Sequence, residues 1–107
     1  MDEREFTVAA EAMLARIERA LEACGADFDF EAKPGGILEL EFADGGKIII
    51  NRHTAAREIW LAAKSGGFHF RFVADDGSWR GTRDGADLLD VLARCMSDQA
   101  GETIKLA

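Results

Sequence analysis

The spacing of apolar residues changes at Gly25 from three or four positions to two, so the chain combines helix and sheet. Before the glycine, seven apolar residues recur as on one face of a helix: Phe6, Ala10, Met13, Leu14, Ile17, Leu21 and Cys24. This spacing predicts an amphipathic helix over residues 3–24, ended by Gly25. From Asp27 onward, apolar and polar residues alternate, which is the period of a half-buried strand.

The alternating region predicts about six short strands joined by turns at 33–36, 44–45, 65–67 and 76–77. A second helix is expected after residues 82–84, with one apolar face formed by Leu88, Leu89, Leu92, Cys95 and Met96. One-sided alternation is typical of an antiparallel sheet with a single covered face. We therefore expect an α+β fold of one domain, residues 1–107, a two-layer sandwich with both helices on one face of the sheet.

Trp60 departs from this one-sided pattern. In the strand predicted over 58–63, Ile59 and Leu61 face the core, so Trp60 lies on the face that no helix covers. Two interpretations are open. The ring packs against a cross-strand neighbour, such as His69 or Arg71, or it anchors a partner protein, as surface aromatic residues often do.

The acidic charge is concentrated in the first 44 residues. Residues 1–44 hold 12 acids and 4 bases, a net charge of −8, and residues 45–107 hold 8 acids and 9 bases, a net charge of +1, which together give −7. Nucleic acid is disfavoured as a partner because phosphate contacts need a basic surface. No apolar run is long enough to span a membrane, and the acidic start has no signal-peptide pattern. We expect a cytoplasmic protein that binds cations or basic protein surfaces.

Many of these acids are predicted to form one surface, the acidic ridge. On a helix, Glu11, Glu18 and Glu22 lie within about 20° of a common line. We expect Asp27, Asp29 and Glu31 to share one face of the next strand, and Asp2, Glu3 and Glu5 to extend the ridge. Carboxylate oxygens suit hard cations, including Fe²⁺ and Fe³⁺. Their wide spacing predicts several weak, exposed metal sites, with these ligands: Glu3, Glu11, Glu18, Glu22, Asp27, Asp29 and Glu31. The alternative is a merely solvated face.

Nothing in the sequence predicts catalytic machinery. Cys24 and Cys95 have no metal-ligand spacing, so both are expected to be free, buried thiols. His53 and His69 are predicted to be loop or sheet-surface residues and not metal ligands. We found no Ser/His/Asp arrangement and no phosphate-binding glycine loop. The chain is therefore expected not to be an enzyme.

Three segments of the middle region carry a family resemblance. They are KIIINR at 47–52, IWLA at 59–62 and GGFHF at 66–70, flanked by GGIL at 35–38 and QAGET at 99–103. In order and spacing they resemble the bacterial frataxin (CyaY) family of iron–sulfur cluster assembly proteins. The resemblance spans nearly the whole chain and implies the two-layer fold predicted above.

The resemblance implies weak iron binding and docking of the acidic ridge on a basic patch of the cysteine desulfurase, in complex with the iron–sulfur scaffold protein. The expected partner contacts are Glu18, Glu22, Asp27, Asp29, Glu31, Asn51, Arg52, Trp60 and His69. Family members often carry dense acidic pairs at the end of the first helix, which are interrupted here by Arg19, Ala23, Gly25 and Ala26.

Three roles follow from the resemblance. The first is a regulator or adaptor of the assembly complex, whose affinity should fall with salt. The second is an iron chaperone that donates Fe²⁺, whose affinity should fall as carboxylates are protonated. The third is iron oxidation or storage, which lacks a recognisable site. A monomer is expected without iron, and oligomerisation driven by iron is left open.

Overall fold

The structure, a computed structural model, describes residues 1–106. Its elements in chain order are α1 Glu3–Ala23, β1 Asp29–Lys33, β2 Ile37–Glu41, β3 Lys47–His53, the 3₁₀ helix η1 Thr54–Ala56, β4 Glu58–Ala63, β5 Gly66–Val73, β6 Ser78–Gly81 and α2 Leu88–Ala100. The six strands form one antiparallel sheet in which each strand pairs with the next along the chain. The predicted α+β class and element order are confirmed.

Local signals account for the bounds of α1. The Asp2 carboxylate accepts a hydrogen bond from the Glu5 backbone N–H at 2.8 Å, and the Glu5 side chain accepts one from the Asp2 N–H at 3.2 Å. This reciprocal capping box satisfies two donors that the first turn leaves unpaired. The helix ends at Ala23, and Gly25 follows with a φ of 71°, a conformation that glycine adopts without strain.

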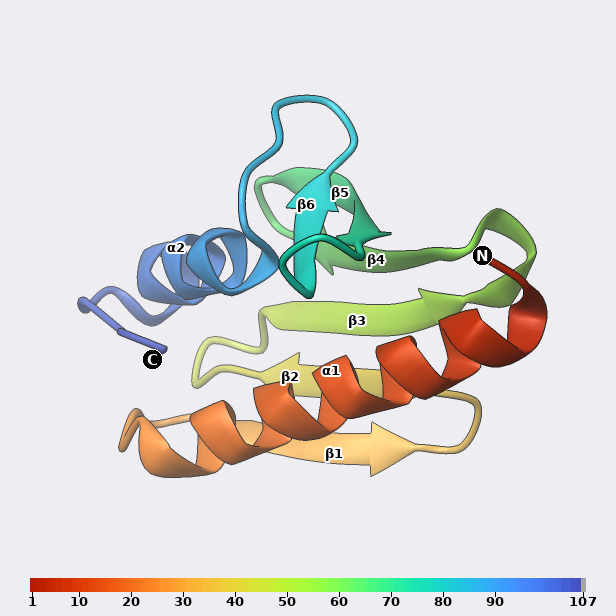
Figure 1. Cartoon of the computed structure of the whole chain (residues 1–107). Coiled ribbons are helices and arrows are strands. Elements are labelled where there is room, and N and C mark those ends of the chain that lie inside the picture. Colours follow the sequence, from red (N-terminus) through yellow and green to blue (C-terminus); the bar gives the residue numbers. More distant parts are fainter. Residues whose placement is uncertain (107) are drawn as a thin grey trace.

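One face of the sheet packs against both helices. Ile48, Ile50, Ile59 and Leu61 point into a buried core, which side chains of α1 and α2 complete. Figure 1 shows α1 running diagonally in front of the sheet at β1 and β2, with α2 towards the other edge. The opposite face of the sheet, here called the open face, has no helix on it. Asn51, Trp60 and His69 lie side by side on it, because the register pairs Asn51 with Trp60 and Trp60 with His69.

The second tryptophan has the opposite environment. Trp79 of β6 is only 2% exposed, and its ring meets Phe6 of α1 edge to face, with the centroids 6.1 Å apart. This contact ties the last strand to the first helix. The two tryptophans therefore lie on opposite faces of the sheet, since Trp60 pairs with His69 and Trp79 pairs with Phe72.

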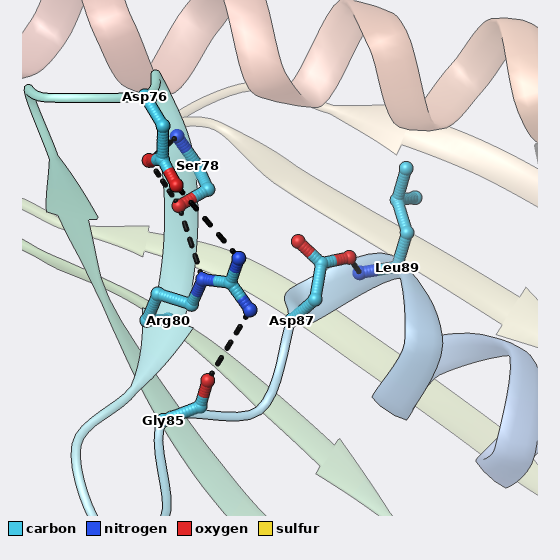
Figure 2. Close-up of polar contacts among 6 residues, drawn as sticks. All are labelled: Asp76, Ser78, Arg80, Gly85, Asp87 and Leu89. Atoms are coloured by element: carbon cyan, nitrogen blue, oxygen red, sulfur yellow. Dashed lines mark hydrogen bonds and ion pairs between the residues drawn. The ribbon is translucent and has the colours of Figure 1, made fainter.

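A polar network attaches the segment between β6 and α2 to β6 (Figure 2). Arg80 donates through Nε to the Ser78 hydroxyl at 3.1 Å and through Nη1 to the Gly85 carbonyl at 3.4 Å. Hydrogen bonds from Ser78, with the nearby charge of Arg80, lower the pKa of Asp76. Asp87 then caps α2 by accepting from the Leu89 N–H at 3.1 Å. These contacts fix where the second helix begins.

Two expectations need correction. Strand β1 begins at Asp29, so Asp27 precedes it and does not share a strand face with Asp29 and Glu31. Cys95 is a buried free thiol as predicted, but Cys24 is only half-buried. None of the helices within residues 1–106 combines the length and apolarity that crossing a bilayer requires.

Candidate functional site

Trp60 lies on the open face with both sides of its ring covered by imidazoles. The His53 ring stacks on one side with centroids 3.7 Å apart and planes 12° apart, and the His69 ring stacks on the other at 4.3 Å and 8°. The indole is consequently half-buried. The cross-strand contact with His69 is the first of the two interpretations open at the sequence level. A partner can still reach the edge of the indole, but its ring faces are occupied.

The turn between β3 and β4 brings His53 to Trp60. His53 caps η1, and its Nδ1 accepts a hydrogen bond from the Ala56 N–H at 3.3 Å. Arg57 then reverses the chain in the left-handed conformation, with φ 57°. The register therefore pairs His53 with Glu58 and leaves the imidazole diagonal to Trp60, within reach of its ring.

A buried carboxylate holds this arrangement from beneath. Glu58 Oε1 accepts from Trp60 Nε1 at 2.8 Å, and Oε2 accepts from Arg71 Nε at 3.0 Å. His69 Nδ1 lies 3.5 Å from Oε1. Burial opposes ionisation of Glu58, but donation from Trp60 and Arg71, with the charges of Arg71 and His69, outweighs it and lowers the pKa of Glu58. We call these five residues, His53, Glu58, Trp60, His69 and Arg71, the Trp60 cluster.

Arg52 does not belong to this surface, contrary to the prediction. It alternates with Asn51 and so points to the helix-covered side of the sheet, where its Nη1 meets Glu11 Oε1 of α1 at 3.0 Å. The side chain lies across the β1–β2 turn: a Cβ added to Gly36 would come within 2.9 Å of the Arg52 Cβ. Arg52 therefore joins β3 to α1 and cannot share a contact with Trp60.

Beyond Trp60, the open face continues as a shallow groove of about 490 Å³. Ile49 and Ala62 pair in register and line it, and Ile49 is 39% exposed. Lys47 and Lys64 also line it. Asp44 also lines the groove, so its apolar side chains lie among charges of both signs.

The acidic ridge has a different character. Its members on α1 and β1 are exposed, apart from a half-buried Glu18, and Glu11 is partly neutralised by Arg52. Asp29 and Glu31 face the open side of the sheet, because they pair with Glu41 and Glu39 across β2. Within residues 1–106, no three His, Cys, Asp or Glu side chains converge on a metal-sized site. The ridge therefore offers separate carboxylates and no preformed cage.

Comparison with known proteins identifies the family to which this architecture belongs. A family model described as "Frataxin-like domain" matches residues 1–102. The chain belongs to the frataxin-like family. It is 60% identical over 106 residues to the "Iron-sulfur cluster assembly protein CyaY" of Dechloromonas aromatica, covering 99% of each chain. It is 45% identical over 107 residues to the CyaY of Neisseria meningitidis serogroup B, covering 100% of this chain and 97% of that one.

Solved frataxins have the same fold as this frataxin-like chain. The frataxin from Psychromonas ingrahamii matches with a TM-score of 0.89 and 32% identity, covering 100% of this chain and 99% of that one. A trimeric frataxin from the yeast Saccharomyces cerevisiae, complexed with ferrous iron, matches with a TM-score of 0.64 and 26% identity over 95% of this chain and 88% of that one. The similarity therefore extends over the whole architecture.

Sequence reasoning missed two members of the Trp60 cluster. The sequence predicts His53 to be a loop or sheet-surface residue, because its contact with Trp60 depends on the shape of the η1 turn. Alternation puts Glu58 on the face of Trp60 but does not predict its burial. A signal was present for Glu58, since an acid two positions before a strand tryptophan lies on the same face. The structure brings Asn51, Trp60 and His69 together as predicted and separates Arg52 from them.

Proposed function

We propose that this frataxin-like protein is a cytoplasmic regulator of iron–sulfur cluster assembly that binds iron weakly and docks on a cysteine desulfurase–scaffold complex. The observation that carries the proposal is the pairing of two distinct surfaces, the exposed carboxylates of the acidic ridge and the ordered Trp60 cluster. The names of its relatives support a role in iron–sulfur cluster assembly. The ferrous complex of the yeast neighbour supports iron as a ligand.

Each surface supports one part of this role. Exposed carboxylates attract a basic partner over a distance of several ångströms and lose that attraction in salt. We assign the desulfurase contact to Glu18, Glu22, Asp27, Asp29 and Glu31. The open face offers an aromatic edge, imidazoles and the Ile49 groove, which require close fit. We assign the second contact, with the scaffold side of the complex, to Asn51, Trp60 and His69.

Iron is held in this proposal by single carboxylates or pairs of carboxylates on the ridge. Glu3, Glu11, Glu18, Glu22, Asp27, Asp29 and Glu31 supply hard oxygen ligands without nitrogen or sulfur donors among them. Such sites bind Fe²⁺ and Fe³⁺ weakly and exchange them readily. Iron that bridges ridges of two copies would give oligomers, and the yeast neighbour that holds ferrous iron is a trimer.

The second candidate is an iron chaperone that delivers Fe²⁺ to the scaffold, favoured by the ferrous complex of the same neighbour. A binding titration against the purified desulfurase–scaffold complex, with and without Fe²⁺, distinguishes the two roles. A regulator binds without iron and loses affinity as salt is raised. A chaperone binds only when loaded and loses affinity as acid protonates its carboxylates. Absence of binding under both conditions would contradict both roles.

A further inference from the structure

Glu58 is a buried charged side chain on the open face, with 8% of the side chain exposed. We infer that Glu58 is a positioning residue, which holds Trp60, His69 and Arg71 in the arrangement that a partner contacts, without itself touching the partner. The partner contact rests on the proposed function, whereas the positioning rests on geometry alone. The two parts can therefore fail separately.

The geometry assigns each carboxylate oxygen a different task. Oε1 accepts the Trp60 Nε1–H at 2.8 Å, which fixes the direction of the indole on the same strand. Oε2 accepts the Arg71 Nε–H at 3.0 Å, which reaches across to β5. His69 Nδ1 lies 3.5 Å from Oε1, on the side of the indole opposite His53. One carboxylate thus contacts three side chains on two strands and fixes their orientations.

A buried carboxylate at this position has no role in the core, because the helices cover the other face of the sheet. Burying a charge is costly unless donors surround it, and an apolar residue of similar size would avoid that cost. Stacking alone leaves an indole free to slide between two imidazoles. A charge-assisted hydrogen bond adds the direction that stacking lacks.

Exposure increases from Glu58 outward. The carboxylate is 8% exposed, whereas the His69 side chain is 47% exposed and that of Arg71 is 70% exposed. The negative charge therefore lies beneath a layer of donors, and a partner meets an imidazole and a guanidinium. This layering gives the Trp60 cluster a different outer charge from the acidic ridge, although both contain a glutamate.

The test compares Glu58→Ala and Glu58→Gln with a matched control, Glu39→Ala. Glu39 lies on the open face of β2, and its carboxylate pairs with Lys33 at 3.2 Å and Lys47 at 3.6 Å, which are not members of the Trp60 cluster. The first readout is the indole N–H signal of Trp60 in ¹H–¹⁵N NMR, assigned with Trp60→Phe. We expect Glu58→Ala to shift this signal and speed its exchange with solvent, and Glu39→Ala to leave it in place.

Glu58→Gln keeps an acceptor oxygen but loses the charge. We expect it to retain most of the indole shift while the Arg71 Nε–H signal loses its protection from exchange. This variant keeps the shape of the side chain, so it decides the question if Glu58→Ala does not fold. If the Trp60 and Arg71 signals are unchanged in every Glu58 variant that folds, the positioning role is wrong. This conclusion does not depend on the result of the binding measurement.

The second readout is affinity for the desulfurase–scaffold complex. We expect Glu58→Ala to weaken binding about tenfold, equivalent to roughly 1.4 kcal/mol. In a Trp60→Ala background the same change should add less than about twofold, because a residue that acts through Trp60 has nothing left to position. Fully additive losses would show that Glu58 acts by another route. If Trp60→Ala itself leaves affinity unchanged, the proposed docking fails, and the indole signal still tests the positioning.

Discussion

The acidic ridge and the Trp60 cluster are both polar surfaces of this frataxin-like chain, but they are built differently. The ridge consists of separate carboxylates on α1, β1 and the segment between them, and most are exposed. In the Trp60 cluster, every side chain contacts another member, and Glu58 is buried beneath them. The ridge attracts a partner through the summed electrostatic potential of many charges. Binding to the cluster requires close steric fit to particular side chains.

This difference determines how each surface tolerates change. Loss of one ridge carboxylate removes only one of many charges that attract a partner. Salt screens the attraction of the other charges beyond a distance of about 8–10 Å. Loss of one member of the cluster disturbs its neighbours, and salt has little effect on stacked rings. The ridge is suited to attracting a partner or a cation, and the cluster is suited to recognising one geometry.

The largest expected effect is on stability, and it differs between the two tryptophans. The comparison shows how much the Trp60 cluster contributes to the free energy of unfolding. Trp79→Ala should lower the free energy of unfolding by about 3–5 kcal/mol, because it empties a core site against Phe6. Trp60→Ala should cost only about 1–2 kcal/mol, because it removes two stacks and one hydrogen bond at the surface. Urea denaturation of both variants measures this. Equal losses would mean that the cluster is part of the folding core.

The next effect tests the link between α1 and the sheet. Gly36 has a φ of 77° and lies against Arg52, whereas Gly35 has a φ of 89° and open space around it. Gly35→Ala should cost about 1 kcal/mol through backbone strain alone. Gly36→Ala should cost about 2–3 kcal/mol, because it also displaces Arg52 from Glu11. Thermal unfolding compares the two, and a smaller loss for Gly36→Ala would contradict the account of Arg52.

A smaller effect is expected at the ridge. Glu18→Lys with Glu22→Lys should weaken binding to the desulfurase about tenfold at low salt, or roughly 1.4 kcal/mol. The loss should shrink towards about twofold in 0.5 M salt. Isothermal titration at two salt concentrations measures it, with Arg19→Ala as a control on the same helix. A loss that does not depend on salt would assign these residues to a close contact instead.

Acid should weaken the cluster before the core. The pKa of Glu58 is lower in the folded chain than in the unfolded one, so its ionised form stabilises the fold at neutral pH. That contribution is complete above the ordinary pKa of a glutamate and is lost as the pH falls through the lowered value. Glu58→Gln should remove part of the stability at pH 7 and flatten its fall in acid. An unchanged pH profile, followed by urea midpoints, would contradict this.

Metal binding should be the weakest effect. Fe²⁺ should perturb NMR signals mainly within residues 2–31, with affinities that are micromolar or weaker, and excess Mg²⁺ or Ca²⁺ should compete because oxygen ligands do not select for softness. Anaerobic titration of ¹⁵N-labelled protein measures this. Tight binding at a single site centred on His53, His69 or Cys95 would contradict the assignment of iron to the ridge.

The sequence was most informative where a property follows from periodicity. The change of spacing at Gly25 predicted α1 and the sheet, and alternation placed Trp60 on the face opposite Ile59 and Leu61. The resemblance grouped Arg52 with Asn51, but adjacent strand residues point to opposite faces, so alternation alone separates them. Sequence patterns give no information where a residue's surroundings depend on turn geometry. The covering of Trp60 by His53 depends on η1, which no pattern in the sequence predicts.

The most direct test of the two-surface account is the salt dependence of binding to the desulfurase–scaffold complex by wild type, the Glu18→Lys and Glu22→Lys double variant, and Trp60→Ala. The account predicts that log affinity falls with log salt for wild type, that the double variant has a flatter slope, and that Trp60→Ala binds about tenfold more weakly with the wild-type slope. Parallel slopes for wild type and the double variant, or a slope altered by Trp60→Ala, would contradict the division of the surface into an attracting ridge and a recognising cluster.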